Sequence, residues 1–373
     1  MLKFLKALSV FAGTIIGVGI FGLPFAAAKA GFFVVLFFFL VITVITILTH
    51  LLYAEIILKE KQPHRLPGYA KKYLGKKWEI VALASFIFAI TGALLAYLIV
   101  GGEFLRLLFS QFMGGDTVSY TLLFFVAGAF LIFRGIKDIS QVELLLFGIF
   151  FVILIIFFFK ALPFIDIAHF QSINWEYFTL PYGVILFSLW GLTTVPEVKE
   201  IIGADRKLLR KVIISGIILA SLTYLFFIVT ILGTSGLNTS KEAMAGFYQV
   251  LGGGIIVLGF AFGIITCFTS FITLGLVLKK MFCCDLGLPQ NLSWFIACFL
   301  PLGLFFLGFK EFIDIIGLAG AFGIGVMGII VVFIYREFLK QTKSKKMNPL
   351  LYLLPIFFIM GAFFEVFYYI FAK

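Results

Sequence analysis

The sequence predicts an all-α integral membrane protein with eleven transmembrane helices, ten of which form two five-helix repeats of opposite orientation. Three observations lead to this fold class. Of the 373 residues, 62% are hydrophobic and 13% are charged, whereas a soluble domain is about half apolar and about a quarter charged. The apolar residues form runs that reach the length of roughly 20 residues needed to cross a bilayer. Two of these runs are interrupted by glycine and proline at corresponding places, five runs apart.

The apolar spans follow one another with short polar connections. They cover residues 4–30, 32–58, 79–108, 118–134, 137–160, 178–203, 208–233, 252–280, 291–309, 311–335 and 349–371. We expect residues 1–373 to form a single transmembrane domain. Within it, residues 4–160 are the predicted first repeat, residues 178–335 the inverted second repeat, and residues 349–371 an additional C-terminal span.

Lysine and arginine orient these spans, because positive residues collect in cytoplasmic loops. With the N-terminus inside, all but six of the 29 basic residues fall on the cytoplasmic side; the exceptions are Lys29, Arg106, Lys160, Lys241, Lys310 and Lys373. The predicted location is therefore the cell membrane, with a cytoplasmic N-terminus and an extracytoplasmic C-terminus. The net charge of +11 reflects this topology and does not indicate a nucleic-acid partner.

The first span contains the stretch "GTIIGVGIFGLP", from Gly13 to Pro24. Each glycine in a helix interior costs roughly 1 kcal/mol relative to alanine, and proline costs about 3. Unwound backbone at membrane depth is tolerated only where it is buried in protein or lines a polar cavity. We therefore expect this helix to be broken at a binding site. Kinks with close G-x-x-x-G packing through Gly13 and Gly17 are the structural alternative.

The sixth span contains the second interruption, "LFSLWGLTTVPEVKE", from Leu186 to Glu200. Pro196 removes an intrahelical donor. The second interruption lies five spans after the first. Five is odd, so the second group runs through the membrane in the opposite sense, as in transporters built from inverted repeats with discontinuous helices. The free N–H groups where a half-helix resumes attract a carboxylate, and the free carbonyls where one stops attract a cation.

At these residues the chain resembles the amino acid permeases of the amino acid–polyamine–organocation superfamily. The resemblance rests on "GTIIGVGIFGLP", "LPGYAKKYLG" (66–75), "AYLIVGGEFL" (96–105) and "VPEVKE" (195–200). It is closest to the aromatic amino acid and auxin-type branches and covers the first ten spans. It implies the leucine-transporter fold, and the twelfth span common in the superfamily is absent.

The resemblance implies a substrate site between the two broken helices. The N–H groups of Val18 and Gly19 would bind the substrate carboxylate, with the Tyr97 hydroxyl nearby. The carbonyls of Ile15, Trp190 and Thr193 would bind the ammonium, and Trp190 would form an aromatic lid on the outer side. Gly191 and its small neighbours leave room for the side chain of the substrate. Because no acidic or basic side chain falls at these positions, the expected substrate is a neutral, apolar or aromatic amino acid.

The resemblance also implies a sodium site between spans one and eight. Its ligands would be the hydroxyls of Thr269 and Ser270 and the carbonyls of Gly13, Ile16 and Thr266. Local bonds of these hydroxyls to their own helix are the alternative. Span five has no lysine before Lys160 to take the place of sodium, which favours Na⁺ over H⁺, although Glu143 in that span could titrate. No cofactor is expected beyond this coupling ion.

The expected function is secondary active, cation-coupled transport of an amino acid by alternating access, with membrane lipid as the only other partner. A proton-coupled permease or an uncoupled exchanger is the alternative. A membrane-embedded enzyme is a distant one, because histidines 50, 64 and 169 are scattered and form no H-E-x-x-H motif. The sequence leaves open which amino acid is carried, symport against exchange, and the oligomeric state.

Charged residues within the spans are functional by default, because charge is costly in a bilayer. We expect Glu55 to pair with Lys59, Glu103 with Arg106, and Glu197 with Lys199 or a span-one residue. Glu311 and Asp314 are candidates for an outer gate. Glu365, in span eleven, has no assigned role.

Overall fold

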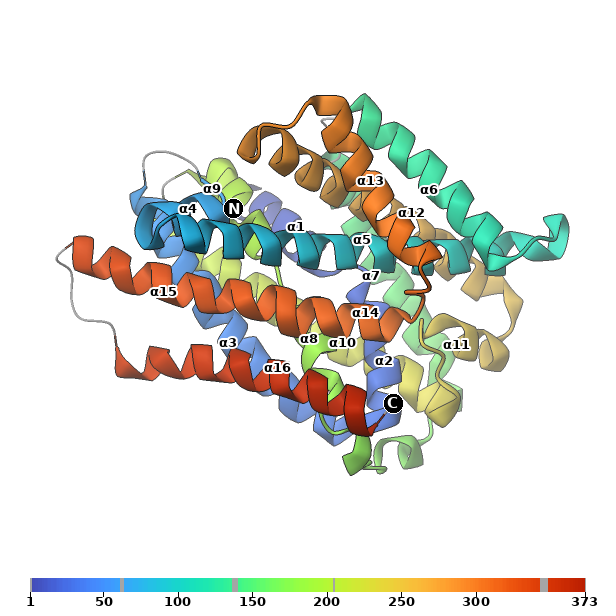
Figure 1. The fold of residues 1–373 in the computed structure, drawn as a ribbon. Coiled ribbons are helices and arrows are strands. Elements are labelled where there is room, and N and C mark those ends of the chain that lie inside the picture. Colours follow the sequence, from blue (N-terminus) through green and yellow to red (C-terminus); the bar gives the residue numbers. More distant parts are fainter. Residues whose placement is uncertain (1, 61–63, 136–139, 204, 343–347, 373) are drawn as a thin grey trace.

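The computed structural model describes residues 2–60, 64–135, 140–203, 205–342 and 348–372. All regular secondary structure in these ranges is helical (Figure 1). The α-helices are α1 (Leu2–Ile15), α2 (Gly19–Ala30), α3 (Phe32–Lys59), α4 (Leu66–Leu74), α5 (Lys76–Met113), α6 (Thr117–Arg134), α7 (Ser140–Ala161), α8 (Leu180–Ser188), α9 (Val195–Ile202), α10 (Arg206–Ser235), α11 (Met244–Leu251), α12 (Gly253–Lys280), α13 (Gln290–Phe306), α14 (Phe312–Leu318), α15 (Gly325–Gln341) and α16 (Leu353–Phe371).

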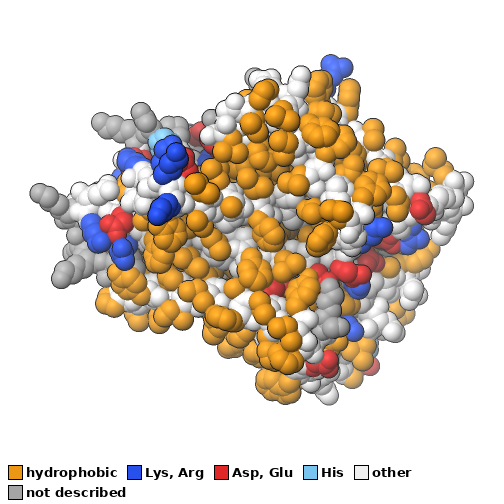
Figure 2. Space-filling view, viewed as in Figure 1, with side chains coloured by type: hydrophobic (Ala, Val, Ile, Leu, Met, Phe, Trp, Pro, Cys, Tyr) orange, Lys and Arg blue, Asp and Glu red, His pale blue; other side chains and the backbone are white. Residues whose placement is uncertain are grey.

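The described residues contain eight helical segments long and apolar enough to cross a membrane. A ninth candidate is the pair α1 and α2, which is bent by 53° at its break. Helix α13 is apolar but shorter, and the segment around residue 190 consists of two short helices, α8 and α9. Hydrophobic side chains cover much of the surface seen in Figure 2. The chain is therefore a multi-pass membrane protein.

The first break lies at residues 16–18, between α1 and α2. Pro24 lies inside α2, so it does not form the break, although the sequence suggested that it would help to. The Gly17 N–H bonds to the carbonyl of Ile15 at 2.8 Å, and this tight turn ends α1.

The second break lies between α8 and α9, where a 3₁₀ turn, Leu192–Thr194, leads into α9. Pro196 is in the first turn of α9. Its missing N–H costs nothing there, since the first N–H groups of a helix have no intrahelical partner. Pro196 thus helps to start the second half-helix and does not interrupt a continuous one, which corrects the sequence-based expectation.

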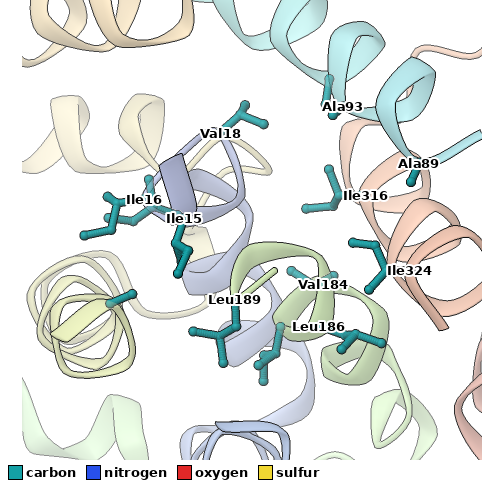
Figure 3. Packing of buried hydrophobic residues seen from close by; sticks show 14 of the residues in the cluster. Ile15, Ile16, Val18, Ala89, Ala93, Val184, Leu186, Leu189, Ile316 and Ile324 are labelled. Carbon is teal, nitrogen blue, oxygen red and sulfur yellow. The ribbon is translucent and has the colours of Figure 1, made fainter. Parts of the chain in front are cut away.

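The half-helices pack directly on each other. A Cβ atom added to Gly19 would lie 3.0 Å from the Ser188 Cα, so the start of α2 touches the end of α8. Figure 3 shows Ile15, Val184, Leu186 and Leu189 in the buried core around these helices. This core positions the unwound segments.

The charged residues pair partly as expected. Glu103 and Arg106 form an ion pair at 2.5 Å, as predicted. The predicted partner of Glu55 is wrong: Glu55 contacts Arg206 at 2.6 Å and Arg210 at 3.4 Å. Lys199 donates to the carbonyl oxygens of Ile57 and Glu60, at 2.7 and 3.4 Å. Contacts between helices far apart in the sequence replace the local pairs that spacing suggested.

Two charged groups hold connecting segments in place. The Glu60 carboxylate, just after α3, accepts hydrogen bonds from Lys72 and Tyr73 of α4. Partial burial raises the pKa of Glu60, but the bonds from Lys72 and Tyr73 outweigh it, so that the pKa lies below its ordinary value. On the opposite side of the bundle, Lys241 pairs with Glu311, joining the segment before α11 to the start of α14.

Candidate functional site

A cavity lies beside the first break, between α1, α2, α5, α7 and α12. Phenylalanine rings and side-chain hydroxyls dominate its lining, and none of the lining residues is charged. The lining residues are Gly13, Thr14, Ile16, Gly17, Ile20, Phe21, Tyr97, Phe147, Phe150, Phe262, Thr266, Thr269, Ser270, Thr273 and Leu274. The cavity therefore suits a neutral ligand with an apolar part and a few polar groups.

The cavity adjoins a second, larger cavity. A larger cavity, of about 1070 Å³, shares Thr14, Thr273 and Leu274 with it. The larger cavity also contains Arg134 and Lys280, which belong to the basic side of the chain. The site thus lies next to a cavity on the side predicted to be cytoplasmic.

Aromatic rings close the other side of the cavity. Phe21 packs edge-on against Phe104, with ring centroids 4.9 Å apart, and against Phe227 at 6.2 Å. Phe104 in turn contacts Phe260 at 5.7 Å. A Cβ added to Gly263 would lie 2.6 Å from the Phe104 ring. This tight packing seals the path towards α11.

The first break leaves backbone groups available to a ligand. The Val18 N–H donates to the Tyr97 hydroxyl at 3.3 Å, and the Gly17 N–H bonds to Ile15. In a continuous helix these two N–H groups would bond to the carbonyls of Thr14 and Gly13. Both carbonyls thus lose their intrahelical donors beside the cavity, where a cation could use them.

Tyr224 of α10 joins the ends of the two half-helices. Its hydroxyl lies 2.7 Å from the Ile15 carbonyl and 2.9 Å from the Ser188 carbonyl, and its side chain is fully buried. These carbonyls are at the C-terminal ends of α1 and α8, where the last carbonyls of a helix have no intrahelical partner. Sequence reasoning missed Tyr224, since nothing in its neighbourhood marks it.

The second break is held by His50 of α3. Its Nε2 accepts a hydrogen bond from the Gly191 N–H at 3.2 Å, and its Nδ1 lies 2.7 Å from the Thr46 carbonyl. Since a carbonyl only accepts, the proton is on Nδ1 and the ring is neutral. The ring also packs edge-on against Trp190 at 5.0 Å. From the sequence, His50 was considered only as a possible zinc ligand. A histidine inside an apolar span is itself a sign of a functional residue, because ionisable groups are costly in a membrane.

The five residues predicted to bind sodium all line the cavity: Gly13, Ile16, Thr266, Thr269 and Ser270. The Thr269 hydroxyl donates to the Thr266 carbonyl at 3.1 Å, which is the local bond considered as the alternative. The Thr266 hydroxyl is buried without a hydrogen-bond partner in the described part of the chain. The side chain of Glu143, the alternative coupling group, lies outside the described residues.

The seven residues predicted to bind substrate lie on several sides of the breaks. Tyr97 lines the cavity, and Val18 bonds to it. Gly19 faces Ser188, and Ile15 packs against Gly191.

The last two, Trp190 and Thr193, belong to the segment around the second break. Trp190 contacts His50 and Phe358, and the aromatic closure is formed by Phe21 and its neighbours. Thr193 lines the larger inner cavity with Glu197. Of the seven predicted substrate residues, only Tyr97 lines the cavity; the other six lie around the two breaks, outside its lining.

The sequence matches known transport proteins over nearly its whole length. Residues 1–367 match the Tryptophan/tyrosine permease family. The chain is 25% identical over 338 residues to Tyrosine-specific transport system 1 of Haemophilus influenzae, covering 83% of this chain and 82% of that protein. It is 20% identical over 348 residues to Glutamine transporter 2 of Aliivibrio fischeri, covering 90% and 88%.

Solved structures share the fold at low sequence identity. MhsT in complex with L-phenylalanine matches with a TM-score of 0.67 and 14% identity, over 100% of this chain and 98% of that one. A nucleobase-cation-symport-1 family transporter, in a closed conformation with bromovinylhydantoin bound, has a TM-score of 0.70 at 12% identity, over 98% and 89%. A manganese transporter of Eremococcus coleocola has 0.68 at 10%, over 98% and 86%. The shared fold is that of the leucine-transporter type.

Proposed function

The chain belongs to the tryptophan/tyrosine permease family, and on this premise we propose that it carries an aromatic amino acid across the cytoplasmic membrane by secondary active transport. It is a membrane-embedded amino acid permease and not an enzyme. The family match over residues 1–367 carries the proposal. The uncharged cavity supports it, since the rings of Phe21, Phe147, Phe150 and Phe262 line it and aromatic rings pack favourably on one another.

The proposed site uses the polar ends of the broken helices. The N–H groups of Val18 and Gly19 bind the substrate carboxylate beside the Tyr97 hydroxyl. The carbonyl of Ile15, with those of Trp190 and Thr193 across the second break, binds the ammonium next to Gly191. In the present conformation tyrosine hydroxyls contact two of these groups: Tyr97 accepts from Val18, and Tyr224 contacts the Ile15 carbonyl. Substrate binding therefore exchanges or shares these contacts.

We propose eleven spans in one domain, arranged as two inverted repeats of five and an extra span, α16. Eight helical segments and the bent pair α1–α2 are candidates by length and composition. The proposal adds the shorter α13 as span nine and the pair α8–α9 as span six. The two broken helices then occupy the first position of each repeat, as in inverted-repeat transporters.

The proposed coupling ion is sodium, bound by Gly13, Ile16, Thr266, Thr269 and Ser270. Oxygen ligands without a carboxylate suit a monovalent cation, and the buried Thr266 hydroxyl lacks a protein partner among the described residues. Proton coupling and exchange are the alternatives.

The proposed orientation has the N-terminus in the cytoplasm and the C-terminus outside, which makes the present conformation open towards the cytoplasm. In alternating access, the outward-open form would separate the rings of Phe21 and Phe104 and the ion pair of Lys241 and Glu311. An exposed ion pair of this kind contributes about 1 kcal/mol or less. The aromatic packing is then the larger barrier to outward opening.

Transport into proteoliposomes tests this function. The purified protein, reconstituted in lipid vesicles, should accumulate radiolabelled L-tyrosine or L-tryptophan when an inward sodium gradient is imposed. Unlabelled aromatic amino acids should compete, and glutamine should compete weakly. Uptake of glutamine in preference to the aromatic amino acids would overturn the substrate class. Equal uptake by empty vesicles would overturn transport itself.

A further inference from the structure

His50 and Tyr224 contact the breaks without lining the cavity. Both side chains are fully buried, and the cavity lining includes neither. His50 accepts the Gly191 N–H of the second break, at 3.2 Å. Tyr224 contacts the Ile15 carbonyl of the first break, at 2.7 Å. Each side chain thus comes from one half of the chain and contacts a backbone group beside the break of the other half; Tyr224 also contacts the Ser188 carbonyl of its own half, at 2.9 Å.

The two residues occupy equivalent places. Helix α3 follows the first broken helix, and α10 follows the second. Counted from Phe32 and from Arg206, His50 and Tyr224 are each the nineteenth residue of their helix. Under the proposed inverted repeat, α3 and α10 are the second spans of their repeats. Residues at the same position are then related by the symmetry of the fold.

Their chemistry is complementary to the backbone groups that the breaks expose. The second break frees an N–H, and neutral His50 supplies an acceptor, Nε2. At the first break the Ile15 carbonyl accepts the Gly17 N–H, and the Tyr224 hydroxyl lies within hydrogen-bond distance of this carbonyl and of the Ser188 carbonyl that ends α8. Burying such a backbone group unpaired in a membrane protein is costly. His50 therefore removes this penalty at the Gly191 N–H, and Tyr224 holds together the carbonyl ends of the two half-helices.

The surroundings keep the His50 ring neutral. Phe11 of α1 and Trp190 of the second break pack against it edge-on, at 6.0 and 5.0 Å, and Thr46 on its own helix accepts from Nδ1. A second ring proton would point at the Gly191 N–H, so the bond requires the neutral form.

We propose that His50 and Tyr224 are a matched pair of backbone clamps, which hold the two unwound segments in the geometry that binds substrate. They are positioning residues, since the clamped backbone and not the side chain contacts the amino acid. The predicted effect on substrate binding rests on the proposed function. The predicted hydrogen bonds to the two breaks do not depend on that function.

Amide hydrogen–deuterium exchange tests the structural part with no substrate present. In His50→Leu the Gly191 amide loses its acceptor, so peptides covering residues 186–195 should exchange at least about tenfold faster, which corresponds to the loss of about 1.4 kcal/mol for one buried hydrogen bond. His50→Gln should restore slow exchange, because its amide oxygen reaches the position of Nε2. Thr49→Val is the matched control, since the Thr49 hydroxyl bonds only within α3, to Ile45.

Equal exchange in His50→Leu, Thr49→Val and the unmodified protein would overturn the clamp at the second break. So would equally fast exchange in His50→Leu and His50→Gln, because simple loss of packing would then explain both. Size-exclusion profiles establish that each variant is folded before it is compared.

Substrate affinity tests the functional part. Tyr224→Phe should raise the dissociation constant for L-tyrosine by about tenfold. The neighbouring control Thr223→Val should leave it unchanged, since that hydroxyl bonds to Leu219 within α10. An unchanged constant in Tyr224→Phe would overturn the positioning role.

The two failures are distinguishable. If the unmodified protein binds none of the aromatic amino acids or glutamine, the proposed function fails. The exchange result at Gly191 still decides whether His50 clamps the second break.

Discussion

The hydroxyl of Tyr97 lies 3.3 Å from the Val18 nitrogen and accepts its N–H at the start of the second half-helix of the first broken span. Tyr97 comes from α5, so this bond joins the break to the third predicted span. The oxygen of Tyr97 stands where a substrate carboxylate would accept the same N–H. Under the proposed function, substrate binding would exchange this hydrogen bond for one between Val18 and the carboxylate.

Tyr97→Phe should weaken substrate binding. It removes the acceptor for Val18 and the hydroxyl proposed to lie beside the carboxylate, and the loss of one such bond is worth about 1 kcal/mol, or about fivefold in the dissociation constant. Equilibrium binding of radiolabelled L-tyrosine measures it. Tyr120→Phe is the control, because the Tyr120 hydroxyl bonds to Gly114 in a connecting segment. An equal effect of both changes would mean that Tyr97 acts only through packing.

Gly17→Ala and Gly13→Ala should differ, although both change the same G-x-x-x-G pair. A Cβ on Gly17 would lie 2.3 Å from the Tyr97 hydroxyl oxygen, whereas a Cβ on Gly13 would meet Phe147 at an ordinary 3.7 Å. Gly17→Ala should therefore lower affinity several-fold. Gly13→Ala should keep affinity and, inside α1, add up to about 1 kcal/mol of helix stability. Thermal-shift and binding assays compare them; equal losses would favour a pure helix-packing motif.

Replacing the two hydroxyls on α12, in Thr269→Val with Ser270→Ala, should abolish the dependence of substrate affinity on sodium. Sodium bound there ties α1 to α12, and linkage requires substrate and sodium to raise each other's affinity by the same factor. Substrate affinity is measured across sodium concentrations at fixed pH, then across pH without sodium. Thr230→Val, whose hydroxyl bonds within α10, is the control. A substrate affinity that does not change with sodium concentration but changes strongly with pH would refute the sodium site. Glu143→Gln would then be the next variant to test.

Composition and periodicity were sufficient for the large features of the fold. The apolar runs gave the helical membrane architecture. The glycine-rich stretch Gly13–Pro24 and the segment with Gly191 and Pro196 marked the two breaks to within a few residues. These signals are local, because a helix must satisfy its own backbone in lipid. The five proposed sodium ligands line one cavity, and sodium binding there stays a prediction.

Contacts between distant helices could not be predicted in the same way. Glu55 pairs with Arg206 of α10 and not with Lys59 one turn away, because bundle packing decides which side chains meet. For the same reason His50 and Tyr224 were missed: their partners are backbone groups more than 100 residues away. Glu365 is now placed, 1% exposed, with its carboxyl against Gly183 and Gly317.

Reporter fusions should establish the orientation. A fusion between residues 59 and 77 should read cytoplasmic, because lysines crowd that segment. A fusion between residues 233 and 252 should read external. Two fusions on the same side of the membrane would show that the number of spans between them is wrong.

The central claim is that an aromatic amino acid binds at the cavity beside the first break. Photo-crosslinking with 4-azido-L-phenylalanine, followed by peptide mapping, tests it most directly. The account predicts label in peptides covering residues 13–21, 147–150 and 262–274, with protection by excess L-tyrosine. Label that excess L-tyrosine does not reduce, or protected label confined to other segments, would contradict it.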